Sequence, residues 1–337
     1  MNLTQAIKNK ALESGFDHVG ICSAAPLDKE RYLLQEWLIQ GYAAGMLYMK
    51  DSFEKRVSPD SLMEGARSII CLGKHYSPVK QSFPFKIASY AHTKDYHQTL
   101  KTPLQRIEDY IDALTEKQVN KMSFIDSGPL LEKAYAKKAG IGFQGKNTNL
   151  IHPAKGSYFF LAEIIVDIEL EYDRPLNVSC GTCNKCVESC PTGALNKPYW
   201  LDSNKCISYL TIENKSAIPP ELREKVGDWI FGCDICQDVC PFNRKAPSQS
   251  EPENSPEITL QRLLEIPSEK RFKEIYNEWS VIRAKKTGLI RNILNASGNL
   301  RITNDFTQIR NLADSSDSEI IKEQAHWTLE RIKPVES

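Results

Sequence analysis

Eight of the ten cysteines in this chain lie between Cys180 and Cys240, and this crowding constrains the fold more than any other feature. Disulfide frameworks are typical of small secreted domains. This chain has 337 residues and opens on an amphipathic pattern rather than on the apolar core of an export signal. Clustered thiols in such a chain indicate a metal centre in a reducing compartment, so we expect a cytoplasmic protein.

The spacing of these cysteines is that of a bacterial ferredoxin. In Cys180-x2-Cys183-x2-Cys186-x3-Cys190-Pro191, three thiolates would hold one [4Fe–4S] cube while the fourth reaches a neighbouring cube. The second run, Cys233-x2-Cys236-x3-Cys240-Pro241, has Ile230 where its first cysteine belongs, and Cys206 is the remaining candidate nearby. We therefore expect a first ligand set of Cys180, Cys183, Cys186 and Cys240, and a second ligand set of Cys190, Cys206, Cys233 and Cys236.

Structural zinc remains the alternative to two cubes, because zinc also accepts four thiolates from paired Cys-x2-Cys elements. A triplet followed by Cys-Pro and then nearly repeated favours the cubes. Such clusters move electrons one at a time, so the chain is either an electron carrier or an enzyme that consumes electrons. The long segments before and after the cysteines favour an enzyme supplied by an external low-potential electron donor. Cys22 and Cys71 stand in apolar runs and are expected in the core.

The pattern along the chain divides it into three expected domains. Residues 1–176 alternate helices and strands, with helices expected over 3–14, 27–39, 96–115 and 130–138 and strands over 18–22, 67–72, 86–91, 122–126 and 157–168. This is an α/β or α+β domain whose strand order the sequence leaves open. Residues 177–245 form a small domain built around its metal. A linker rich in Pro and Ser precedes residues 257–337, which resemble short HEAT-type helical repeats, with one helix ending at Gly298.

Composition excludes several classes of function. The hydrophobic fraction is 41% and the charged fraction 26%, as in ordinary globular proteins. No run approaches the roughly 18 apolar residues of a membrane helix. The net charge is zero, so only a local patch could attract a polyanion. Residues 281–310 carry six basic residues against one acidic residue, which indicates either a phosphate-binding patch or a solvated helix face. The nucleic-acid candidates are Arg283, Lys285, Lys286 and Arg291.

A glycine-rich loop and one carboxylate are the other candidate site features. Gly140-Ile141-Gly142-Phe143-Gln144-Gly145 fits the dinucleotide pattern, but a helix precedes it and a strand follows, the reverse of the required order. A loop able to hold a large polar cofactor remains. Asp126 follows an apolar strand and precedes Pro129, so it is either a helix N-cap, which the residues alone favour, or a catalytic group. His97 follows Asp95 as in a corrin-binding motif, but Leu100 replaces the glycine of that motif.

Four stretches together resemble one known family. They are Ile125-Asp126-Ser127-Gly128-Pro129-Leu130-Leu131-Glu132-Lys133, the run from Ala139 through Gly145-Lys146-Asn147-Thr148-Asn149 to Ile151, and both cysteine groups. On these residues the chain resembles the epoxyqueuosine reductases, cobalamin-dependent iron–sulfur enzymes of queuosine synthesis in transfer RNA.

The resemblance implies a nitroreductase-like domain that binds cobalamin, followed by the two-cluster domain and the helical repeats. It implies that the clusters reduce cobalt, and that the epoxide of epoxyqueuosine in the tRNA anticodon loop is then reduced. Asp126 matches the family's proton donor, a role that we expect to require a raised pKa. The candidate cobalamin contacts are Arg56, Tyr90, Lys146, Asn147, Thr148, Asn149 and His152.

Two rival functions remain at this point: a corrinoid reductive dehalogenase and a ferredoxin-like electron carrier. The first would normally carry an export signal and would need no basic helical tail. Nothing in the sequence requires more than a monomer.

Overall fold

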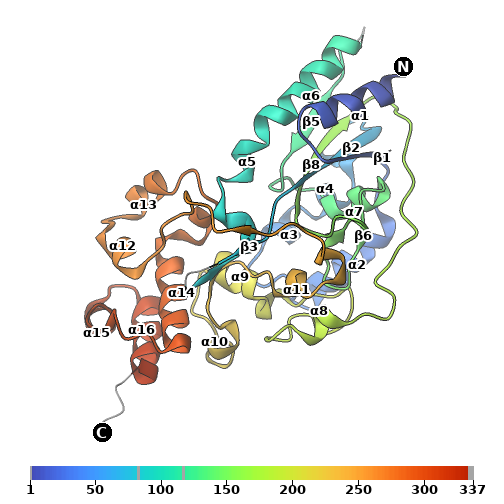
Figure 1. Cartoon of the computed structure of the whole chain (residues 1–337). Helices are drawn as coiled ribbons and strands as arrows, with labels where there is room; N and C mark the ends of the chain where they lie inside the picture. The colour runs from blue at the N-terminus through green and yellow to red at the C-terminus, as the bar shows by residue number, and fades with distance from the viewer. Residues whose placement is uncertain (1, 82–83, 116–117, 333–337) are drawn as a thin grey trace.

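The computed structural model describes residues 2–81, 84–115 and 118–332 (Figure 1). The last five residues of the expected helical domain, 333–337, lie outside the described ranges. Among the described helices, none is long and apolar enough to cross a membrane.

A four-stranded antiparallel sheet in the order β1-β2-β8-β5 organises the N-terminal half. Its strands are β1 His18–Ser23, β2 Ser68–His75, β5 Lys121–Phe124 and β8 Phe159–Val166. Successive residues of β2 point to opposite faces, so Ile70 and Leu72 enter one apolar core while Ile69 and Cys71 enter another. A strand buried on both faces explains why β2 and β8 are almost continuously apolar in sequence.

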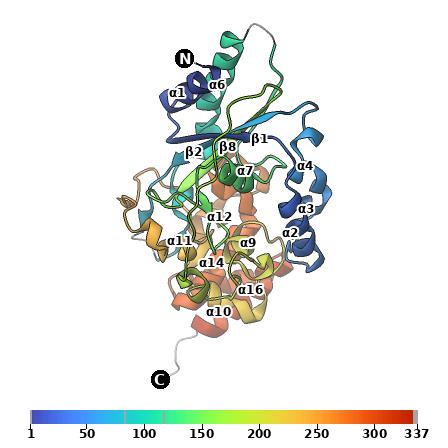
Figure 2. The ribbon, with the colours of Figure 1, turned by 90° about the vertical axis from the view of Figure 1, so that its right-hand side faces the viewer.

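Helices cover both faces of this sheet (Figure 2). Helices α1 Leu3–Glu13 and α6 Lys101–Leu114 bury Ile7, Ile107 and their neighbours on the face of Leu72. Helix α7 Glu132–Lys138 buries Tyr135 on the face of Cys71. The shorter elements of this half are α2 Asp28–Ile39, α3 Tyr48–Asp51, α4 Phe53–Val57, η1 Pro59–Ser61, β3 Val79–Lys80, β4 Lys86–Ile87, η2 Ser89–His92, α5 Tyr96–Thr99, β6 Phe143–Gln144 and β7 Leu150–Ile151.

The cysteine segment, here residues 177–250, is built from short elements. They are α8 Lys185–Glu188, η3 Ser203–Lys205, α9 Ile207–Ile212, α10 Pro220–Val226, β9 Trp229–Phe231, α11 Ile235–Asp238, η4 Pro241–Asn243 and β10 Gln249–Ser250. Helix α8 carries Cys186, α11 carries Cys236, and the two helices pack against each other. Strand β9 pairs with β4, and β10 pairs with β3, so this segment is joined to the N-terminal half by main-chain hydrogen bonds.

The C-terminal helices surround α14 (lower left in Figure 1). They are α12 Leu260–Glu265, α13 Glu269–Ile275, η5 Ser280–Ala284, α14 Lys285–Leu300, α15 Phe306–Ser315 and α16 Glu319–Ile332. Their core includes Ile230 and Phe231 of β9 and also Ile87 of β4. The helices are therefore anchored on the cysteine segment and on the N-terminal half.

Three expected elements differ in the structure. The strand expected over 86–91 stops at Ile87, because the chain turns into η2 where the Ser89 N–H donates to the buried Asp234 carboxylate. The helix expected over 96–115 is broken at Leu100, and Pro103 then stands in the first turn of α6, where no donor is needed. Gly298 does not end its helix. It lies inside α14, where a Cβ would stand 2.6 Å from the Trp327 ring.

Candidate active site

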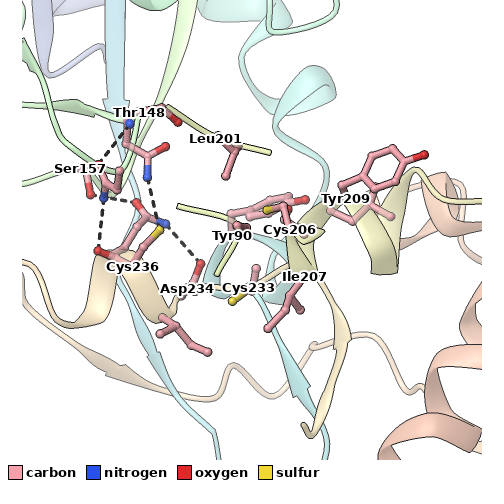
Figure 3. A pocket seen from close by; sticks show the side chains of 18 of the residues that line it. Tyr90, Thr148, Ser157, Leu201, Cys206, Ile207, Tyr209, Cys233, Asp234 and Cys236 are labelled. Atoms are coloured by element: carbon pink, nitrogen blue, oxygen red, sulfur yellow. Dashed lines mark hydrogen bonds between the residues drawn. The ribbon is translucent and has the colours of Figure 1, made fainter. Parts of the chain in front are cut away.

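A cavity of about 470 Å³ lies where the sheet, the cysteine segment and the C-terminal helices meet. Tyr90 and Asp126 reach it from the N-terminal half, Cys206 and Cys233 from the cysteine segment, and Arg283 from η5, just before α14. Figure 3 shows Tyr90, Cys206 and Cys233 among the side chains that line the cavity. The volume falls in the range of small-molecule and cofactor sites.

The second ligand set faces this cavity, and the first does not. All four members of the second set line the cavity, whereas Cys180, Cys183, Cys186 and Cys240 are outside its lining. In the described residues, no three His, Cys, Asp or Glu side chains gather closely enough to hold a single metal ion.

The cysteines that raise one another's thiol pKa values belong mostly to the same ligand set. Burial raises the pKa of the Cys240 thiol, and nearby Cys180 and Cys183 raise it further. Burial likewise raises the pKa of Cys206, with Cys190 as its cysteine neighbour. The pKa of the Cys236 thiol is raised by burial and then by cysteines of both sets, so the two groups adjoin.

The loop between β6 and β7 holds the cysteine helix α11 against the cavity. The Asn147 side-chain amide donates to the Cys236 carbonyl at 3.2 Å, and the Asn149 amide approaches the Cys236 sulfur at 3.9 Å. Thr148, between them, has a φ of +66°, a conformation that L-residues rarely adopt. The loop is therefore shaped to place two amides on one cysteine and to present Thr148 to the cavity.

Asp126 stands between β5 and α7 with a φ of +58°. It is not a helix cap, because α7 begins at Glu132 and Leu131 occupies its N-cap position. Instead its carboxylate accepts a hydrogen bond from the Tyr96 hydroxyl at 2.6 Å and one from Arg283 at 3.2 Å. His97 Nε2 lies 3.6 Å from the same oxygen. A strained residue held by three polar neighbours is typical of functional sites.

The expectation of a raised pKa at Asp126 is wrong for this arrangement. Burial raises the pKa of the carboxyl, but the nearby His97, the hydrogen bond from Tyr96 and the charge of Arg283 outweigh burial and hold the pKa below its usual range. Burial lowers the pKa of His97, yet Asp126 and Asp95 bring it up to about 9. At neutral pH, the proton of this pair therefore resides on His97.

One carboxyl that lines the cavity, Glu132, has a raised pKa. Burial raises the pKa of Glu132 to about 8, and the charge of Asp126 adds to this shift. Behind it, burial raises the pKa of Glu163 well above its usual value, and its Oε1 has no hydrogen-bond partner among the described residues. Carboxyls that remain protonated near neutral pH can donate protons.

The structure brings together four of the seven expected cobalamin contacts. Tyr90, Asn147, Thr148 and Asn149 line the cavity. The other three are outside its lining and have other neighbours. Arg56 lies over the Tyr48 ring, Lys146 donates to Asn184, and His152 stacks on His18.

The basic residues expected to bind nucleic acid do not form one surface. Arg283 is bound to Asp126 and Glu213 in the cavity wall. Lys286 donates to the Ile266 carbonyl, while Lys285 is exposed. The assignment of Arg291 to a surface patch is wrong, because its side chain is 1% exposed. Its guanidinium donates to the main-chain carbonyls of Leu210, Asn214 and Ser216.

Sequence reasoning missed the groups that surround Asp126. Tyr96 and His97 lie about 30 residues before Asp126, and Arg283 lies 157 residues after it. Glu132 belongs to the stretch from Ile125 to Lys133, but the sequence gives no indication of a role for it. The only signal was Asp95 followed by His97, which pointed to a corrin motif that the chain does not complete.

Comparison with known proteins identifies the family. A sequence model described as epoxyqueuosine reductase QueG, DUF1730 matches residues 56–127, and one described as a 4Fe-4S double cluster binding domain matches residues 179–243. The epoxyqueuosine reductase of Leadbetterella byssophila is 43% identical over 298 residues, which cover 86% of this chain and 97% of that protein. The chain belongs to the epoxyqueuosine reductase family.

Solved structures of epoxyqueuosine reductases have the same fold. One holds an epoxyqueuosine-modified stem loop of a tyrosine tRNA, with a TM-score of 0.88 at 31% identity, covering 98% of this chain and 90% of that one. The Bacillus subtilis enzyme matches with a TM-score of 0.85 at 30% identity, covering 98% and 90%. That structure is described as having a catalytic aspartate loop swung out of the active site. Members of this family are oxidoreductases, and the chain carries their double-cluster domain.

Proposed function

We propose that this protein reduces epoxyqueuosine to queuosine at the wobble position of tRNA. The observation that carries the proposal is a single cavity lined both by the second ligand set and by Asp126. Electrons and protons can thus reach the same space. Removing the epoxide oxygen to leave an alkene breaks both C–O bonds, consumes two electrons and two protons, and releases water.

We propose that the eight thiols hold two [4Fe–4S] clusters in the two sets defined above. The donor chemistry fits, since each set supplies four sulfur atoms and each motif ends in Cys-Pro. The second set is the one that delivers electrons to the cavity, since its four cysteines line that space. We assign residues 177–245 to this domain, between a nitroreductase-like catalytic domain, residues 1–176, and a HEAT-like tRNA-binding domain, residues 257–337.

We propose cobalamin as the immediate electron acceptor, and the chemistry of the cavity lining supports this proposal. Its wall combines aromatic side chains such as Tyr90 with the amides and main chain of the Asn147, Thr148 and Asn149 loop, next to the second ligand set. These residues suit a large ring bearing amide groups, and they would hold it against the cysteines. Cobalamin, when bound, would supply low-valent cobalt to the epoxide carbon.

We propose that Asp126 and His97 act together as the proton donor. The pair holds one proton at neutral pH, and Asp126 is the member that lines the cavity. A proton stored on His97 therefore reaches the departing oxygen through Asp126. Protonated Glu132, which also lines the cavity, is placed to supply the second proton that water formation requires.

The experiment is a single turnover under anaerobic conditions. Purified, pre-reduced protein loaded with cobalamin is mixed with an anticodon stem loop carrying epoxyqueuosine, and the nucleosides are identified by mass spectrometry. We expect conversion to queuosine. Protein that holds reduced clusters but leaves the nucleoside unchanged would be an electron carrier, and the proposal would be wrong.

Asp126→Asn tests the site within the same experiment. Asparagine keeps the shape of the side chain but cannot pass on a proton, so we expect unchanged iron content and stem-loop affinity with at least a hundredfold slower turnover. Asp314→Asn, an exposed position on α15, is the matched control. Full turnover in Asp126→Asn would remove Asp126 from the mechanism.

A further inference from the structure

The first ligand set marks where electrons must enter, if the proposed function holds. Its cysteines lie outside the cavity lining, whereas the second set faces the cavity. An external donor therefore has to approach the first set. The chain around Cys180 and Cys183 is exposed, including Gly181, Thr182 and Asn184. The thiols of this set thus lie just below the protein surface.

An apolar surface lies beside these thiols. Leu176, Val178 and Tyr199 are 36%, 40% and 41% exposed, although side chains of this kind are usually buried. Tyr199 is close to the first set, because its pKa is raised by partial burial and then by Cys180 and Cys186. The Tyr199 N–H also donates to the carbonyl of Lys146, whose ammonium group binds Asn184 beside α8. The cysteine loop and the tyrosine are thereby held together.

Basic residues predominate near this surface. The segments that adjoin the first set are residues 152–158, 174–200 and 235–248, and they carry two acidic residues, Glu188 and Asp238, of which Asp238 accepts a hydrogen bond from the Tyr158 hydroxyl. Residues 152–158 belong here because Gly156 packs against Phe242 and Asn243, next to Cys240. The same segments carry six exposed basic residues: Lys155, Arg174, Lys185, Lys197, Arg244 and Lys245. In a chain of zero net charge, this excess is local.

We propose that this surface, which contains Leu176, Val178 and Tyr199 and the six basic residues of the same segments, docks a small acidic protein that carries single electrons. Charge complementarity would steer the carrier to the first ligand set, and the apolar side chains would exclude water from the path of electron transfer. A low-affinity encounter suits a partner that must leave after each electron.

An RNA ligand fits this surface less well. The exposed apolar side chains offer nothing to a phosphate backbone. The modified nucleoside must also reach the cavity wall that holds Asp126 and Arg283, which the first ligand set does not line. We therefore assign the surface to the electron carrier.

The test uses the charge-reversal variant Lys197→Glu with Lys245→Glu, which changes two exposed residues from two of these segments, both outside the cavity lining. The matched control is Lys101→Glu with Arg106→Glu on α6, two exposed positions far from α8 (Figure 1). A flavodoxin in its two-electron-reduced form is the probe. Stopped-flow absorbance of the flavin semiquinone gives the rate at which the oxidised clusters accept an electron. Turnover of the stem loop with dithionite is measured in parallel.

We expect the surface variant to accept electrons from flavodoxin at least tenfold more slowly at low salt, with a weaker dependence on salt, while the control matches the wild type. Dithionite-driven turnover should be unchanged, because dithionite needs no docking site. An unchanged rate of electron transfer from flavodoxin would overturn the proposal. If that rate were unchanged and the stem-loop affinity fell instead, the surface would be assigned to RNA. Failure of the proposed function is distinct: the wild type would accept electrons but leave epoxyqueuosine unreduced.

Discussion

Replacing His97 with glutamine should remove the proton that Asp126 passes to the substrate. In the wild type the His97 pKa of about 9 leaves roughly 99 in 100 molecules with a proton on the pair at pH 7. Without His97, a carboxyl of ordinary pKa, about 3.9, is protonated in only about one molecule in 1,000 at that pH. Tyr96 and Arg283 would keep the Asp126 pKa lower still.

The expected loss in single-turnover rate is therefore between about 10²- and 10⁴-fold, the range that general acid catalysis supplies. The pH profile gives the more specific signature. The wild-type rate should hold at neutral pH and fall as pH rises through about 9, whereas the variant should lose about tenfold for each pH unit between pH 5 and 8. His326→Gln on α16, an exposed position, is the control.

The assay uses pre-reduced protein and epoxyqueuosine stem loop, quenched over milliseconds to minutes at each pH. The pKa of His97 is higher in the folded protein than in the unfolded chain, so its ion pair with Asp126 and Asp95 adds to the free energy of unfolding. This contribution is complete below pH 6.5 and disappears as the pH rises through about 9. A His97→Gln variant with the wild-type rate and pH profile would refute the shared-proton reasoning.

Three further predictions concern other parts of the molecule. Arg291→Met should lower the free energy of unfolding by about 3–5 kcal/mol, since it takes the donor from the buried main-chain carbonyls of Leu210 and Asn214. Thermal melts should show this loss, with the stem-loop affinity of the remaining folded protein unchanged. Lys285→Glu should weaken stem-loop binding several-fold and reduce its salt dependence, and unchanged binding in a filter assay would clear this residue of a role. Cys206→Ala should halve the iron content, while full iron content would exclude Cys206 as a ligand.

Local sequence patterns were enough to predict most strands. Cysteines with two or three residues between them share one short segment, so the proximity of Cys233 and Cys236 needs no tertiary information. Strand β2 could likewise be predicted, because its run Ile69–Leu72 is buried on both faces of the sheet and is apolar at every position. The strand order β1-β2-β8-β5 could not be predicted, because the sequence of one strand does not show which distant strand pairs with it.

The surroundings of Asp126 and the burial of Arg291 depend on tertiary contacts. Tyr96 and Arg283 reach Asp126 from distant segments, so no window of sequence contains the site. In the sequence, Arg291 and Lys285 are two of several basic residues, and nothing there shows which of them is buried. Six positions along a helix rotate a side chain by about 240°, which turns Arg291 into the cysteine segment while Lys285 stays in solvent.

Iron and acid-labile sulfide in anaerobically purified protein, combined with electron paramagnetic resonance after reduction, test the central claim most directly. The account predicts about eight iron and eight sulfide ions per chain, with the spectrum of two interacting [4Fe–4S] clusters. Protein that retains zinc at these cysteines, with neither sulfide nor a reduced-cluster signal, would leave the cavity without a source of electrons and would contradict the account.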